Sequence, residues 1–188
     1  MKKQLIIIST FALLLSNLVV ANEISYKGKV KGMVCAFCTY NVSKKISTIP
    51  GVIDASVNVN LKSGAFSFLS TMAVKKTQIS ETISDSGFQL LSFSEVKPSQ
   101  INSLVYSNKA KIQLEFAVSD ISLFEEVLDE VGNIAIKTPS KIQITAPAAT
   151  EIEILKPLIA GKQREIKIQF INNQNENIQI KLFQKAHD

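Results

Sequence analysis

The chain contains few of the side chains from which catalytic sites and zinc sites are built. Its 188 residues include no tryptophan, one histidine and two cysteines. The histidine, His187, lies one residue from the end of the sequence, with no cluster of candidate ligands around it. A glycine-rich phosphate loop and a Met-rich or His-rich tract are also missing. These absences argue against nucleotide chemistry and histidine-based catalysis, and we expect the protein not to be an enzyme.

Dense positive charge is missing as well. The formal net charge is +5, of which residues 22–96 carry +3 and residues 97–188 carry none. A nucleic-acid-binding protein usually presents a denser basic stripe with interleaved aromatic side chains. We therefore expect no nucleic-acid partner.

The longest apolar run lies at the start of the sequence. Leu5–Val20 follows Lys2 and Lys3 and contains four polar interruptions. This pattern, with small residues before Asn22, is typical of a signal peptide, and the run is shorter than the roughly 20 apolar residues that span a bilayer. We expect residues 1–21 to be a cleaved signal peptide. The mature protein should then be periplasmic or otherwise secreted, with no stable membrane insertion after cleavage.

Both cysteines lie in one short motif, in which Cys35 and Cys38 are separated by two residues. The periodicity of the following residues predicts a helix from Ala36 to about Thr48. Both sulfur atoms are then expected at one exposed helix N-terminus, where backbone amides favour negative charge and lower a thiol pKa. Two converging thiolates form a soft site that suits Cu(I), Hg(II) or another thiophilic cation.

Two alternatives to metal binding remain for this dithiol. Export would place it in an oxidising compartment, where a disulfide can form, although a bridge that closes so short a loop stabilises a fold little. A thioredoxin-type redox site has the same spacing, but here no tryptophan precedes Cys35 and no proline lies between the cysteines. We favour metal binding over a redox role and over a structural disulfide.

The residues around the motif predict alternating strands and helices. Their order, strand-helix-strand-strand-helix-strand, is that of a ferredoxin-like sandwich, an α+β fold with both helices on one face of an antiparallel sheet. Of these elements, residues 53–61 show the clearest strand alternation. Besides the helix at the cysteines, the expected elements are strands at 24–31, 53–61, 65–70 and 88–93 and a helix at 75–86.

The seven residues Gly32–Cys38 resemble the G-M-x-C-x-x-C loop of heavy-metal-associated domains. These are the small modules of copper chaperones, metal-pumping ATPase tails and periplasmic mercury-binding proteins, and the resemblance covers residues 25–94. It implies the same ferredoxin-like fold, in a domain that we expect at 22–96, with Cys35 and Cys38 as the metal ligands. It also implies that Met33 is a hydrophobic tether beneath the loop.

Two aromatic residues near the motif are of special interest. The resemblance places Phe88 next to the metal loop, where soluble copper chaperones often have lysine. Phe37 departs from the family pattern, which has a small residue between the cysteines. An exposed ring at this position would shield the metal, contact a partner or hinder the approach of another thiol.

The second half of the chain is less informative. Polar residues and Pro98 predict a linker at 97–109, followed by a small, β-rich α+β domain at 110–188 with no cysteine. This domain is interpreted either as a degenerate second ferredoxin-like unit or as an unrelated accessory domain, and no function is assigned to it. Strands are expected at 111–118, 134–136 and 142–144, either a helix or a strand at 152–158, and a strand pair formed by 166–170 and 178–182. A helix is expected between the first two strands, with Asp120 as its N-cap and Gly132 at its end.

These observations predict an exported protein that carries Cu(I) on Cys35 and Cys38 and transfers it by ligand exchange. The expected partner is a metal donor or acceptor, such as a metal-transporting ATPase or another dithiol domain. The alternatives are an Hg(II)-binding protein of detoxification and a dithiol oxidoreductase or redox sensor.

Overall fold

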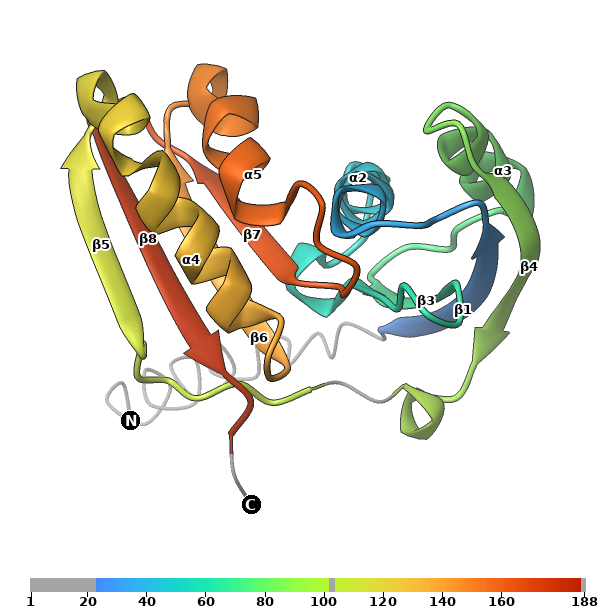
Figure 1. Cartoon of the computed structure of the whole chain (residues 1–188). Coiled ribbons are helices and arrows are strands. Elements are labelled where there is room, and N and C mark those ends of the chain that lie inside the picture. The colour runs from blue at the N-terminus through green and yellow to red at the C-terminus, as the bar shows by residue number, and fades with distance from the viewer. Residues whose placement is uncertain (1–22, 102–103, 187–188) are drawn as a thin grey trace, which may run out of the picture.

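The computed structural model describes residues 23–101 and 104–186. The expected signal peptide at 1–21, its cleavage position before Asn22, and His187 lie outside these residues. Two four-stranded sheets, each with its own helices, lie side by side (Figure 1). Of the helices that the structure describes, none is both long enough and apolar enough to cross a membrane.

The N-terminal half has the ferredoxin-like fold that the sequence predicts. Its sheet has the strand order β2-β3-β1-β4, and all neighbouring strands are antiparallel. The elements are β1 (Ile24–Lys31), α2 (Ala36–Ser47), β2 (Asn58–Val59), β3 (Ala65–Ser70), α3 (Lys76–Ser84) and β4 (Gln89–Val96).

Apolar residues at helical spacing hold α2 and α3 against this sheet. Val42 and Ile46 of α2, and Ile79 and Ile83 of α3, are fully buried and share one core with Phe68 of β3. Burying each such side chain contributes about 1.5 to 3 kcal/mol relative to an exposed position. This core fixes one face of α2 and therefore the position of the cysteine motif at its start.

The expected strand at 53–61 is mostly wrong. Only Asn58–Val59 forms a strand, while Asp54–Ser56 forms a single 3₁₀ turn. The Ser56 hydroxyl accepts the backbone N–H of Leu69 at 2.8 Å, which replaces a bond of the strand ladder. The alternation holds at Val57 and Val59, which are buried, and fails at Ala55, which lies in the 3₁₀ turn and is exposed.

The C-terminal half is a second small α+β domain, as expected. Its sheet has the order β5-β8-β6-β7, in which β6 and β7 are parallel and the other pairs are antiparallel. This order excludes the interpretation as a second ferredoxin-like unit. The elements are β5 (Ile112–Ala117), α4 (Glu125–Ala135), β6 (Ser140–Ala146), α5 (Glu151–Ile159), β7 (Lys167–Asn172) and β8 (Asn177–Gln184). Both helices cover the same face of the sheet (Figure 1).

The expected pairing of 166–170 with 178–182 is wrong, although both segments contain strands. Strand β7 pairs with β6, and β8 lies between β5 and β6. Helix α5 connects β6 to β7, and such a crossover brings two parallel strands together. Proximity along the chain therefore predicted the wrong partner.

Helix α4 continues past Gly132, where the sequence predicts its end. It ends at Ala135, so the expected strand at 134–136 is also wrong. A Cβ atom at Gly132 would lie 2.0 Å from the carbonyl oxygen of Leu158 in α5. Glycine is therefore used here for close packing of two helices, and not to terminate one.

The structure also decides the expectations for Asp120 and for residues 152–158. Asp120 does not cap α4, because it lies within the 3₁₀ segment Val118–Phe124 that precedes the helix. The ambiguous segment 152–158 is helical despite Pro157, since Leu155 and Leu158 face the core and are fully buried. Tertiary packing of this apolar face outweighs the local cost of the proline.

The segment expected as a linker, 97–109, joins the two halves. After a 3₁₀ turn at Pro98–Gln100, its second part runs beside the end of β8. The backbone N–H of Ser107 donates to the carbonyl of Gln184 at 2.9 Å. The exact boundaries, 22–96 and 110–188, stay predictions.

Candidate metal centre

The structure brings the two cysteines together at the N-terminus of α2. Strand β1 ends at Lys31, and Gly32 turns the chain with a φ of 107°. Cys35 is the N-cap of α2, and Cys38 lies in the first helical turn. The backbone N–H of Cys38 donates to the Cys35 sulfur at 3.3 Å. Both thiols are free and half-buried, so they can face one ligand together while solvent reaches them.

No hard ligand completes this site within the part of the chain that the structure describes. There, no group of three or more His, Cys, Asp or Glu side chains is placed to hold a metal ion. A structural zinc site needs four such ligands. The arrangement therefore suits a soft ion of low coordination number, for which two thiolates suffice.

The two thiols differ in acidity. Burial and hydrogen bonding with Cys38 raise the pKa of Cys35 above its usual value of 9.0. At Cys38 burial also opposes ionisation, but hydrogen bonds from Cys35 and from backbone groups outweigh it and lower the pKa. The expectation that the helix N-terminus lowers a thiol pKa is thus met at Cys38 and is wrong for Cys35.

We expect Cys38 to be alkylated before Cys35 in the reduced, metal-free protein. The thiolate is the reacting form, and a lower pKa populates it at lower pH. Iodoacetamide at a series of pH values below 9.0, followed by peptide mass spectrometry, measures each site separately. Faster modification of Cys35 throughout this range would contradict the prediction.

Two residues pack beneath the metal loop as the resemblance implies. Met33 is partly buried against the core of the first domain. Phe88 lies beside the turn, since a Cβ atom at Gly32 would be 3.4 Å from its ring. Val34, in contrast, is 76% exposed and is the outermost apolar side chain of the loop. The side of the motif with Met33 and Phe88 is therefore packed against the first domain, and the side with Val34 is exposed to solvent.

Phe37 is not the exposed ring that the sequence allowed. It packs against the core of the second domain, together with Ala36 and Tyr40, which are buried there. Helix α2 thus has a second apolar stripe and lies between the two domains (Figure 1). Sequence reasoning missed this stripe, although the spacing of residues 36, 37 and 40 places them on one face. The departure of Phe37 from the family pattern follows from this packing.

A hydrogen bond and an ion pair connect the same face of α2 to the second domain. The Tyr40 hydroxyl donates to the Glu151 carboxylate of α5, and burial and this contact raise the tyrosine pKa. Lys44 pairs with the same carboxylate at 2.5 Å. Because Glu151 is itself 9% exposed, these two partners supply the hydrogen bonds that a buried carboxylate needs.

The backbone of the cysteine motif is also held directly. The N–H of Ala36, between the two cysteines, donates to the carbonyl of Lys162 at 3.0 Å. The Lys162 side chain is 8% exposed, and its ammonium pairs with Asp129 of α4 at 2.6 Å. This ion pair, in which Lys162 is buried and Asp129 is exposed, holds the loop after α5, and the loop in turn holds the start of α2.

Comparison with known proteins gives one family for the first domain. Residues 29–89 match the model of the heavy-metal-associated domain. A curated relative, copper-transporting ATPase 1 of Rhizobium meliloti (strain 1021), is 38% identical over 61 residues. That match covers 32% of this chain and 7% of the relative, so this chain spans only a small part of the ATPase.

Among solved structures, three similar chains each give a TM-score of 0.33. The CopZ metallochaperone is 29% identical, with 36% of this chain and 98% of that chain covered. A copper binding domain from HMA7, a P-type ATPase, is 25% identical, with 39% and 95% covered. The N-terminal soluble domains of Bacillus subtilis CopA are 19% identical, with 89% and 82% covered.

Proposed function

Because residues 29–89 belong to the heavy-metal-associated domain family, we propose that this protein carries Cu(I) on Cys35 and Cys38 and transfers it to a partner. The observation that carries the proposal is the pair of free, half-buried thiols at one end of α2. Thiolates are the ligands that Cu(I) prefers. The similarity to a part of a copper-transporting ATPase supports copper over Hg(II) as the cargo.

The proposed transfer is a ligand exchange, without oxidation or reduction. A thiolate of the partner attacks the two-coordinate metal, and a three-coordinate intermediate forms. One of the two cysteine sulfurs then leaves as its bond to the metal breaks, and a second exchange completes the transfer. A site with few ligands allows this, because an incoming thiolate finds room at the metal.

The packing of α2 restricts the side from which a partner can approach. The second domain covers the face that carries Phe37 and Tyr40. The side of Val34 remains open, with that side chain 76% exposed. We propose that a dithiol domain, in an ATPase or in another carrier, meets the metal from the side of Val34.

Export is a further part of the proposal. It is supported by the basic and apolar pattern of residues 1–21, which is typical of a signal peptide. In a periplasmic or otherwise secreted location the dithiol must be kept reduced or metal-bound, because oxidation would join the two sulfurs and remove the ligands.

Anaerobic titration of the reduced mature chain with Cu(I), against a chromophoric chelator, tests the proposal. We expect one Cu(I) per chain, followed by rapid transfer to a separate dithiol domain. Protein oxidised at Cys35 and Cys38 beforehand is the matched control and should take up none. The competing redox function is measured by insulin-disulfide reduction. Multiple turnovers without Cu(I) uptake would replace the carrier function with catalysis.

A further inference from the structure

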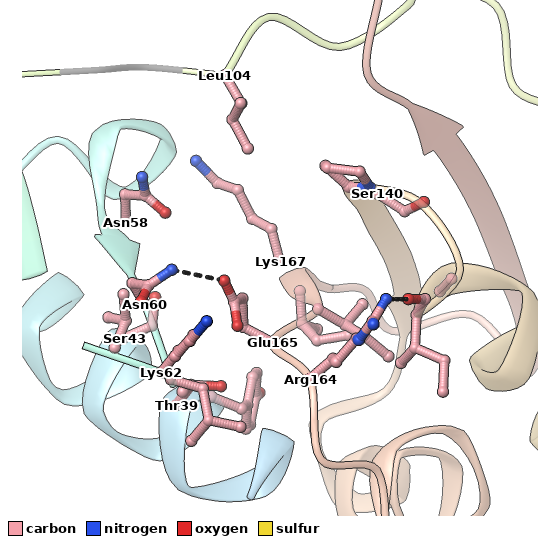
Figure 2. Close-up of a pocket in the computed structure, with 18 of the residues that line it drawn as sticks. Thr39, Ser43, Asn58, Asn60, Lys62, Leu104, Ser140, Arg164, Glu165 and Lys167 are labelled. Carbon is pink, nitrogen blue, oxygen red and sulfur yellow. Dashed lines mark hydrogen bonds between the residues drawn. The ribbon is translucent and has the colours of Figure 1, made fainter. Parts of the chain in front are cut away.

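A cleft of about 590 Å³ lies between the two domains. Its walls come from α2 and β2 of the first domain, from the start of β6 and from the loop that leads into β7 (Figure 2). A volume of this size is within the usual range for small-molecule sites, which often lie at domain interfaces. Cys35 and Cys38 do not line it.

The charge of the lining is strongly one-sided. The cationic residues are Lys62, Lys137, Arg164 and Lys167, and the only carboxylate is that of Glu165. The Glu165 oxygen already accepts the side-chain amide of Asn60 at 2.7 Å (Figure 2). In residues 23–101 and 104–186 the ion pairs are Lys44–Glu151 and Lys162–Asp129, so none of the four cations has a carboxylate partner.

Of these cations, Lys167 gives the strongest indication of an anion site, because it reaches into the cleft from β7 (Figure 2). Its ammonium donates to the carbonyl of Ala55 at 2.7 Å. Burial lowers the pKa of this lysine, and the nearby charge of Lys141 lowers it further, while Asp54 acts in the opposite direction. A partly desolvated ammonium without an anionic partner is unfavourable, and a bound anion would relieve this cost.

Neutral donors and apolar side chains complete the lining. Hydroxyl groups of Thr39, Ser43 and Ser140 line the cleft, although those of Thr39 and Ser140 already donate to backbone carbonyls. Tyr106 adds another, and burial and the charge of Glu165 raise its pKa to about 12, so this hydroxyl stays protonated at neutral pH. The apolar side chains that line the same space include Val57, Leu61, Leu104, Ile136 and Ile168.

We propose that this cleft binds a small organic anion that carries two negative charges on carboxylate or phosphate groups and has an apolar body. Its negative charges match the cations that lack a carboxylate partner, of which Lys167 and Arg164 donate only to backbone carbonyls, and the apolar body matches the aliphatic part of the wall. Such a ligand would touch both domains at once. The site is separate from the cysteine motif, so this proposal does not depend on copper binding.

Isothermal titration of the metal-free mature chain with two aromatic dianions tests the proposal at low salt. Isophthalate presents carboxylates and phenyl phosphate presents a phosphate, so the tighter ligand identifies the preferred group. We expect saturable one-to-one binding of at least one of them, weakened by added NaCl. Neutral isophthalamide, which has the same ring, should not bind.

Matched charge variants show where the anion binds. Lys167→Gln and Arg164→Gln should each weaken binding about tenfold, the effect of losing one charge-assisted hydrogen bond. Lys29→Gln makes the same change of charge on the exposed surface of β1, away from the cleft, and should leave affinity unchanged. Circular dichroism checks that each variant is folded, and Arg164 is exposed enough for its replacement to be tolerated.

Two results would overturn the proposal. One is the absence of saturable binding of either dianion at millimolar concentration. The other is an equal loss of affinity in Lys29→Gln and in the cleft variants, which would show general attraction to a basic protein. The double variant Cys35→Ser/Cys38→Ser should bind the dianion normally, so failure of copper binding and failure of this site are distinguishable.

Discussion

Replacing both cysteines, in Cys35→Ser/Cys38→Ser, is expected to abolish stoichiometric Cu(I) binding. Loss of a residue that only supports a metal ligand costs about 10- to 100-fold in affinity, and removal of both ligands should exceed that range. No replacement cluster of ligands exists in the described residues. Competition with a chromophoric Cu(I) chelator under anaerobic conditions measures the affinity.

The single variants and a methionine control make this result specific. Cys35→Ser and Cys38→Ser should each leave one thiolate and bind Cu(I) weakly. Met72→Leu removes an exposed thioether of similar softness and should bind like the unaltered chain. Undiminished affinity in the double serine variant would show that the copper site lies elsewhere.

Gly132→Ala is expected to destabilise the second domain by about 3 kcal/mol, at the upper end of typical overpacking costs. Alanine is normally better than glycine inside a helix. Here its Cβ atom would lie 2.0 Å from the backbone oxygen of Leu158, and a backbone atom cannot rotate away. Helices α4 and α5 would have to separate. For a chain of this size the Tm should fall by about 6 to 12 °C, measured by thermal denaturation followed by far-UV circular dichroism.

Gly161→Ala is the matched control for this substitution. Gly161 has a positive φ of 72°, but nothing lies within 4 Å of an added Cβ atom. The expected cost is therefore only backbone strain of about 1 kcal/mol. A Tm for Gly132→Ala equal to or above that of Gly161→Ala would show that α4 and α5 are not tightly packed in solution.

Local sequence spacing determined the fold of the first domain and the candidate metal ligands. Two cysteines separated by two residues at the start of an amphipathic helix must lie at the same end of it, because they are less than one helical turn apart. For the same reason the buried residues of α2 and α3 could be read from their spacing. In each case the relevant residues are close together in the chain, so backbone geometry alone relates them.

Only the tertiary structure decided how the two halves of the chain meet. Periodicity shows that a side chain is inward or outward, and it does not name the partner that covers it. Tyr40 and Glu151 are 111 residues apart, and Asn60 and Glu165 are 105 apart. The strand order of the second sheet, the continuation of α4 past Gly132, the covered face of α2 and the cationic cleft all depend on contacts between distant segments. They follow from which surfaces fit together when the whole chain packs.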